Sequence, residues 1–130
     1  EKDLINLPLL GTIAAGNPIE AIENTEDKIQ IPLNLISPNK KNYVLKIEGD
    51  SMINKGIVDG DKAIIEYCND ANNGDIVVAL INENEVTLKK LKKDKEKIYL
   101  IPENDNYKIQ SFNPDEVSIQ GKLKGIIRSY

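Results

Sequence analysis

The sequence predicts a mostly β protein, and three observations lead to that fold class. Short apolar stretches alternate with turn residues about every ten residues, a spacing that is typical of strands and indicates roughly eight or more of them. No segment carries a long helical periodicity of apolar residues. Ile, Leu and Val dominate the apolar residues while aromatic residues supply only 5% of the chain, so we expect an aliphatic core.

The chain is expected to form one domain that follows the end of a linker. At 130 residues it is long enough to bury about two thirds of its unfolded surface around a single core. Residues 1–6 are polar and are expected to be the end of an interdomain linker, which leaves residues 7–130 as the domain. The sequence opens with Glu1 and its only methionine is Met52, so we expect a natural polypeptide that starts further upstream.

The expected strands are apolar stretches that lie between clusters of Asn, Asp, Gly, Pro and Ser. Residues 76–81 form an unbroken apolar run rich in β-branched residues, which is typical of a strand buried on both faces. Residues 82–84 predict a tight hairpin into a strand at 85–91, and residues 50–61 predict one short helical turn bounded by glycines. The other strands are expected at residues 29–36, where Pro32 interrupts the alternation, and at 43–49, 62–67, 97–102 and 117–129.

Composition excludes several classes of function. The chain has 17 Lys and Arg against 21 Asp and Glu, and a net charge of −4 argues against a grip on nucleic-acid phosphates by these residues. It has no histidine, which excludes a Ser-His-Asp triad, a Cys-His pair and a His-ligated zinc site within the chain. Cys68 is the only cysteine, so no internal disulfide can form and a reducing compartment is expected.

We expect no metal, no cofactor and no contact with a membrane. Four acids near glycines could suggest calcium binding, but their spacing does not match a calcium loop and turns explain them better; they are Asp59, Asp61, Asp70 and Asp75. No apolar run approaches the roughly 18 residues that span a bilayer, and no signal-peptide pattern opens the chain. A cytoplasmic protein is therefore expected.

Ser51 is a candidate nucleophile within the sequence Gly-Asp-Ser-Met at residues 49–52. A serine at the mouth of a short helical turn has backbone N–H groups around it that lack an intrahelical partner. Such donors can hold the negative oxygen that develops during acyl transfer. The same position also suits a helix N-cap, and these residues taken alone favour that simpler interpretation.

In the absence of histidine, a serine nucleophile needs another base, and lysine is the natural candidate. The ordinary pKa of lysine is about 10.4, so the amine must be buried to lose its proton near neutral pH. It must also stand on a rigid element, and the strand expected at residues 85–91 offers Lys89 and Lys90 on opposite faces. Periodicity does not decide between the two lysines, and these residues taken alone favour the simpler interpretation of two exposed strand lysines.

Nearly the whole chain resembles the LexA-type family of self-cleaving repressors, peptidase family S24. Three motifs carry the resemblance in the correct order, namely Ala-Ala-Gly at residues 14–16, Gly-Asp-Ser-Met at 49–52 and Val-Thr-Leu-Lys-Lys-Leu at 86–91. The resemblance implies a LexA/signal-peptidase-like fold of several short, coiled β-sheets with minimal helix. The matching stretches are LPLLGTIAAGNP, LKIEGDSMINKGIVDGD, NGDIVVALINENEVTLKKLKK, LIPENDNYK and GKLKGIIR.

The resemblance also implies a role for each matching residue. Ser51 matches the family's nucleophile, and Lys89, the first lysine after Val-Thr-Leu, matches its general base. Ala15–Gly16 matches the peptide bond that is cut. Backbone N–H groups at or beside Ser51 are implied to hold the oxyanion, and Thr87 is expected to hydrogen-bond the Lys89 amine. The supporting residues are Asp50, Met52 and Thr87.

The function implied by the resemblance is that of the regulatory C-terminal domain of a transcriptional repressor of the DNA-damage (SOS) response. This domain would be a serine endopeptidase that cuts its own chain and thereby inactivates the repressor. The implied partners are a second copy of the chain in a homodimer, the RecA–single-strand DNA filament that stimulates cleavage, and operator DNA bound by an upstream domain. The alternatives are a UmuD-like self-cleaving protein associated with a polymerase, and a phage-type repressor domain that dimerises without cleavage.

Overall fold

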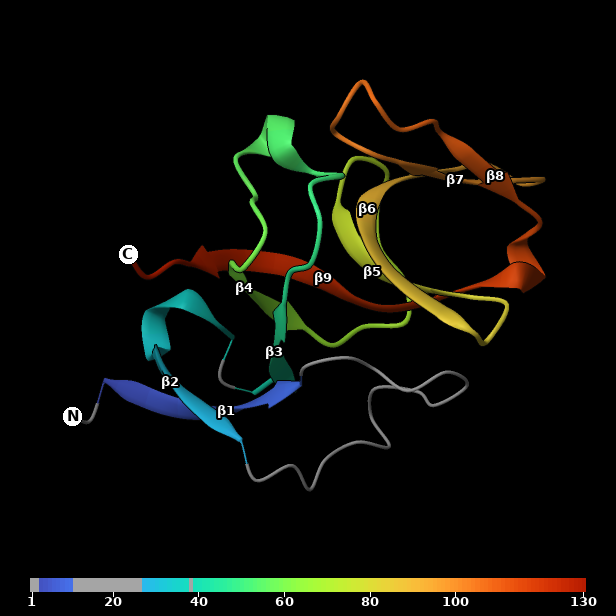
Figure 1. Cartoon of the computed structure of the whole chain (residues 1–130). Helices are drawn as coiled ribbons and strands as arrows, with labels where there is room; N and C mark the ends of the chain where they lie inside the picture. The colour runs from blue at the N-terminus through green and yellow to red at the C-terminus, as the bar shows by residue number, and fades with distance from the viewer. Residues whose placement is uncertain (1–2, 11–26, 38) are drawn as a thin grey trace.

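The computed structural model describes residues 3–10, 27–37 and 39–130. Within these ranges the chain consists of nine β-strands and three very short 3-10 helices, which confirms the mostly β class (Figure 1). None of these helices is long and apolar enough to cross a membrane. The strands are β1 (Leu4–Leu10), β2 (Lys28–Pro32), β3 (Asn42–Lys46), β4 (Lys62–Glu66), β5 (Ile76–Ile81), β6 (Glu85–Lys93), β7 (Ile98–Ile101), β8 (Gln110–Phe112) and β9 (Val117–Ile127); the helices are η2 (Leu33–Leu35), η3 (Ile53–Lys55) and η4 (Pro114–Glu116).

The strands form one coiled sheet in the order β2-β1-β3-β4-β9-β5-β6-β7-β8. Most neighbouring strands are antiparallel, and β1 and β3 form a short parallel pair. β9 lies in the middle because its 11 residues pair with β4 along one side and with β5 along the other. β5 to β8 curl on one side of β9, and β1 to β4 lie on the other side (Figure 1). The several coiled sheets expected from the resemblance are thus joined into one.

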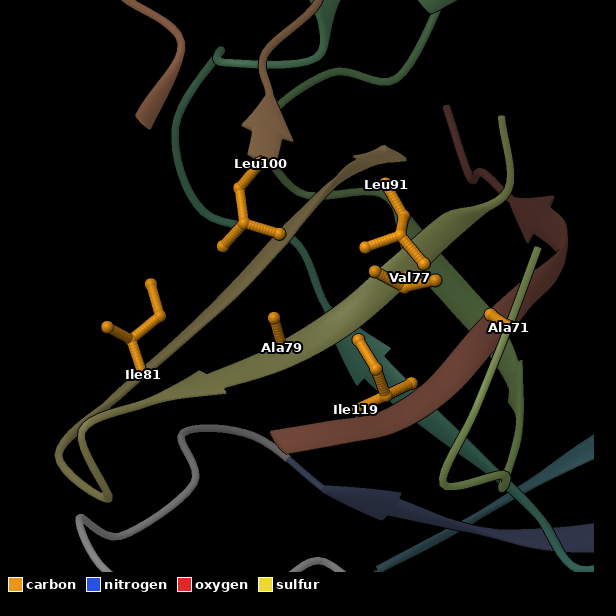
Figure 2. Packing of buried hydrophobic residues seen from close by; sticks show 7 residues of the cluster. All are labelled: Ala71, Val77, Ala79, Ile81, Leu91, Leu100 and Ile119. Atoms are coloured by element: carbon orange, nitrogen blue, oxygen red, sulfur yellow. The ribbon is translucent and has the colours of Figure 1, made fainter. Parts of the chain in front are cut away.

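Aliphatic side chains on both faces of the sheet build the core. In β5 the side chains of Val77, Ala79 and Ile81 point into the curl, which is the space enclosed by the curved part of the sheet from β5 to β8. There they meet residues of β6, β7 and β9 (Figure 2). Val78, between them in sequence, belongs to a second cluster against β3 and β4. The strand is apolar at every position because both of its faces are covered. The second cluster comprises Leu10, Tyr43, Leu45, Ala63, Ile65 and Val78, and a third comprises Leu7, Ile31, Ile36, Val44 and Ile64.

Some strand boundaries differ from those expected. β2 ends at Pro32 and the next three residues form η2, because proline has no N–H with which to continue the ladder. β8 has only three residues, two of them exposed and polar, so its sequence carries no strand signal. β1 begins at Leu4 and pairs with β2, although residues 1–6 were expected to end a linker. The role of residues 1–6 as the end of a linker stays a prediction.

A close approach between β9 and its neighbour β4 occurs at Gly121. The register of β9 against β5 shifts between Ile119 and Gly121, and the buried Tyr43 hydroxyl donates a hydrogen bond to the Gln120 carbonyl oxygen at 2.8 Å. Burial raises the pKa of Tyr43, so its phenol stays protonated and able to donate. A Cβ atom at Gly121 would lie 2.9 Å from the backbone carbonyl oxygen of Glu66 and would also meet the Ile65 side chain. Only glycine fits this position.

We predict that Gly121→Ala lowers the free energy of unfolding by about 1–3 kcal/mol, because the added methyl group must displace backbone as well as a core side chain. Gly125→Ala, on the same strand, is the matched control, since its Cβ would meet only Ile64 Cδ1 at an ordinary 3.7 Å. Urea unfolding of both variants measures the difference. Equal stability of the two variants would show that β9 tolerates a side chain at Gly121.

Candidate active site

A cleft of about 410 Å³ opens between the end of β3, the segment that follows it and the start of β6. The cleft is apolar where β3 and β6 face it, and Ser51 and Thr87 contribute hydroxyl groups to it. Two exposed carboxylates, those of Glu48 and Glu85, belong to the same lining. The full lining comprises Leu45, Lys46, Ile47, Glu48, Gly49, Ser51, Met52, Asn84, Glu85, Val86, Thr87 and Leu88.

Ser51 lies half-buried in the turn that leads into η3. Gly49 starts this turn with a φ of +88°, which favours glycine, and its N–H donates to Asp59 Oδ1 at 2.7 Å. The N-cap of η3 is Met52 rather than Ser51, and no side chain caps the helix. The interpretation of Ser51 as an N-cap is therefore wrong, because the Ser51 hydroxyl does not cap this helix.

Two backbone donors stand beside that hydroxyl. In the part of the chain that the structure describes, the N–H groups of Ser51 and Met52 donate to no carbonyl or side-chain acceptor. The next N–H, that of Ile53, already donates to the carbonyl oxygen of Asp50 at 3.2 Å. Unused backbone donors next to a serine hydroxyl are the groups that can stabilise a developing oxyanion.

The loop after β7 holds the turn that carries Ser51. The Glu103 N–H donates to the Ser51 carbonyl oxygen at 2.8 Å. The Asn104 side chain donates to the Asp50 carbonyl oxygen at 2.9 Å, and the Tyr107 hydroxyl donates to Asp50 Oδ1 at 2.5 Å. The Asp50 carboxylate raises the pKa of Tyr107, which keeps this donor protonated. Asp50 therefore faces the loop after β7, and it is not part of the cleft lining.

An ion pair between the buried Asp61 carboxylate and the exposed Arg128 guanidinium fixes the other end of the same segment. Asp61 is only 1% exposed, and its carboxylate accepts hydrogen bonds from Arg128 Nε at 2.6 Å and Nη2 at 2.8 Å. Arg128 also donates to the Gly56 carbonyl oxygen at 2.7 Å, and the Val58 N–H donates to Asp61 at 2.9 Å. The hydrogen-bonded guanidinium lowers the pKa of the Asp61 carboxyl. The C-terminal end of β9 is thus tied to the segment that carries Ser51.

Lys89 stands half-buried on β6, opposite Val77 of β5. Its register follows from the hairpin between the two strands, where Asn82 and Glu83 adopt left-handed backbone angles. The Lys89 amine lies 2.5 Å from Thr87 Oγ1, which is the hydrogen bond expected between these two residues. Burial lowers the pKa of the Lys89 amine, and the negative charge of Glu85 opposes this shift.

The structure brings three of the predicted site residues to one cleft, and Lys89 lies next to it without being part of its lining. Ser51, Met52 and Thr87 line one cleft, and Thr87 also contacts the Lys89 amine. Between these described residues no hydrogen bond joins the Ser51 hydroxyl directly to the Lys89 amine. The bond Ala15–Gly16 lies outside the described residues. The roles of all these residues in a reaction stay predictions.

The acids near glycines divide into turn residues and one buried residue. Asp70 accepts a hydrogen bond from the Ala71 N–H at 2.9 Å, and Asp75 accepts one from the Asn72 N–H at 3.0 Å, which confirms the turn interpretation for both. The turn interpretation is incomplete for Asp61, because this residue also forms the ion pair described above.

Sequence reasoning missed the residues that support the site from outside the cleft. These residues lie in the stretches LIPENDNYK and GKLKGIIR, which carry part of the family resemblance but were not predicted to contact the site. Their contacts join segments far apart in the sequence, so no local pattern indicates them. The missed residues are Glu103, Asn104, Tyr107 and Arg128.

Comparison with known proteins agrees with this geometry. Residues 8–124 match the family described as peptidase S24-like. The LexA repressor of Clostridium novyi (strain NT) is 54% identical over 129 residues, which cover 99% of this chain and 63% of that protein. The LexA repressor of Clostridium perfringens (strain SM101 / Type A) is 53% identical over 130 residues, and that of Clostridium botulinum (strain Langeland / NCTC 10281 / Type F) is 49% identical over the same length; each alignment covers 100% of this chain and 63% of the relative.

The chain thus spans less than two thirds of the length of these relatives. The family match extends over most of the chain and includes the serine-bearing turn, the cleft and β6. The chain belongs to the peptidase S24-like family, which is of the serine-peptidase kind.

Proposed function

We propose that this chain is the self-cleaving C-terminal domain of a LexA-type repressor, and that Ser51 and Lys89 cut its own Ala15–Gly16 bond. The observation that carries the proposal is the desolvated Lys89 amine, which contacts Thr87 at the cleft that also holds Ser51. A lysine whose pKa is lowered by burial has the property that a general base requires. The family match and the names of the relatives support the same function.

The proposed reaction is acyl transfer followed by hydrolysis. The Ser51 oxygen attacks the carbonyl carbon of Ala15 while neutral Lys89 takes the hydroxyl proton. The resulting oxyanion accepts hydrogen bonds from the unused N–H groups of Ser51 and Met52. The bond to Gly16 then breaks, and Lys89 returns the proton to the departing amine. Neutral Lys89 next activates a water molecule, which releases the acyl group from Ser51.

In this proposal the catalyst and its substrate share one chain, so their effective concentration is high and their encounter does not limit the rate. The rate is set instead by the conformation of the chain. Lys89 hydrogen-bonds Thr87 rather than Ser51, and charged Lys89 cannot act as a base. A segment carrying Ala15 that closes over the cleft would exclude water from Lys89 and favour its neutral form. Closure would thus place the peptide bond and activate the base together.

The partners follow from the same proposal. An upstream domain would bind operator DNA, and a homodimer would raise the effective concentration of the two DNA-binding domains. The RecA–single-strand DNA filament would stimulate cleavage by binding the closed state more tightly than the open state. Cleavage between the halves would end repression. The relatives are named LexA repressors, which favours this function over a UmuD-like one.

We predict that the chain, incubated at about pH 10, yields two pieces that end at Ala15 and begin at Gly16, because Lys89 is then neutral. Ser51→Ala and Lys89→Ala should each slow the reaction at least about a thousandfold. Ser111→Ala and Lys92→Ala are matched controls on exposed strand positions and should cleave like the parent chain. Mass spectrometry identifies the pieces. An intact parent chain would favour the non-cleaving, phage-type alternative.

We predict that the cleavage rate rises with pH and that Glu85→Gln moves this rise to lower pH. The Glu85 charge stabilises protonated Lys89, so its removal lowers the pKa of the amine and increases the neutral fraction below the plateau. Because Glu85 is exposed, the rate at neutral pH should increase only about two- to fivefold, with the alkaline plateau unchanged.

Glu83→Gln is the control for this prediction, since Glu83 is an exposed acid of the same hairpin and does not contribute to the pKa of Lys89. Rates measured by gel densitometry across the pH range give both profiles. A flat parent profile between about pH 7 and 10 would contradict a lysine base.

A further inference from the structure

Lys90 follows Lys89 directly on β6, the proposed mechanism does not use it, and its amine has a defined partner. Its amine pairs with Glu103 Oε2 at 3.0 Å, with 35% of the Lys90 side chain and 19% of the Glu103 side chain exposed. Glu103 follows β7, and in the sheet Lys90 itself lies opposite Ile101 of β7. The ion pair thus fastens the loop after β7 to the strand that carries Lys89.

The backbone of Glu103 contacts the turn around Ser51 through both its N–H group and its carbonyl group. Its N–H donates to the Ser51 carbonyl oxygen at 2.8 Å, and its own carbonyl oxygen accepts the Asn54 N–H at 2.7 Å. One residue therefore contacts the nucleophile's turn through its backbone and the base's strand through its side chain.

The contact with the Ser51 carbonyl has a consequence for the oxyanion donors. In a planar trans peptide the C=O and N–H groups point in opposite directions. The Ser51 carbonyl and the Met52 N–H belong to one peptide plane. The hydrogen bond from Glu103 therefore sets the direction of the Met52 N–H, which is one of the two proposed oxyanion donors.

We propose that Glu103 is a positioning residue for self-cleavage, and that its ion pair with Lys90 aligns the Ser51–Met52 peptide with the strand that carries Lys89. This proposal rests on the function proposed above. Lys90 and Glu103 do not touch the reacting atoms. They fix the separation and orientation of two groups that come from distant segments, and misplacement of such groups by even 1 Å can slow a reaction about a hundredfold.

The ion pair between Lys90 and Glu103 is expected to affect the rate of cleavage rather than the stability of the fold. Both side chains are partly exposed, so the ion pair adds little to the stability of the fold. The backbone hydrogen bonds of Glu103 remain in any side-chain variant. Loss of the pair should therefore loosen the alignment without unfolding the domain, and slow cleavage by about tenfold.

The test compares cleavage rates on the alkaline plateau for Glu103→Gln, Lys90→Gln and the double variant. Each single variant should cleave about tenfold more slowly than the parent chain, and the double variant should be no slower than either, because one interaction is lost in all three. The reversed pair Lys90→Glu with Glu103→Lys should recover part of the rate. Lys92→Gln, two residues along the same strand face and exposed, should cleave like the parent.

The pH at the midpoint of the rate profile should stay where it is in the parent chain, since the Lys89 environment is unchanged. Urea midpoints of all variants report whether folding is intact. Single variants within twofold of the parent rate, or additive losses with no recovery in the reversed pair, would overturn the positioning role. In either case cleavage by the parent, with none by Ser51→Ala, would leave the proposed function standing. If the parent chain does not cleave at all, the proposed function itself fails.

Discussion

The desolvation of one amine is the constraint on which the rest of the site depends. An exposed lysine near neutral pH is charged and cannot accept a proton, so the fold must keep water from Lys89 without offering it an acid as a close partner. β6 meets this demand because it lies between β5 and β7, with Leu91 of the same strand inside the curl. The nearest source of negative charge that opposes the shift, Glu85, is exposed at the end of the strand.

Ser51, the proposed nucleophile, has a different requirement, because its hydroxyl must be accessible to the peptide bond while the surrounding backbone stays fixed. The turn around Ser51 contains little regular structure, and hydrogen bonds within its own segment and from two distant parts of the chain hold it in place. Asp59 binds Gly49 at the start of the turn, Arg128 binds Asp61 at its end, and the loop after β7 binds its middle. Among the described residues, the N–H groups of Ser51 and Met52 have no acceptor, while the carbonyl oxygens of Asp50, Ser51 and Met52 each accept a hydrogen bond. The segment around Ser51 is thus irregular in structure, and hydrogen bonds to other parts of the chain fix its position.

The sequence predicted those parts of the molecule whose signals are local. The apolar run of β5, the hairpin at residues 82–84 and the short turn ended by Gly56 all appear in the structure where they were expected, because each depends on side-chain periodicity or on turn chemistry. The choice between Lys89 and Lys90 needed the family resemblance, since alternation alone assigns them only to opposite faces. The contacts of Glu103 with Ser51 and of Arg128 with Asp61 could not be predicted, because each joins residues more than 50 positions apart. β8 could not be predicted either, because its exposed polar residues resemble a loop.

The central place of β9 has a consequence for the order in which the molecule matures during translation. β9 joins the β4 side of the sheet to the β5 side, and Arg128 just beyond it secures the segment that bears Ser51. Until β9 and Arg128 have been synthesised, β4 and β5 have no common neighbour and Asp61 lacks its Arg128 partner. A nascent chain without β9 would therefore hold Ser51 and Lys89, the proposed nucleophile and base, on two parts of the sheet that are not yet joined. The proposed self-cleavage would then have to wait for the synthesis of β9.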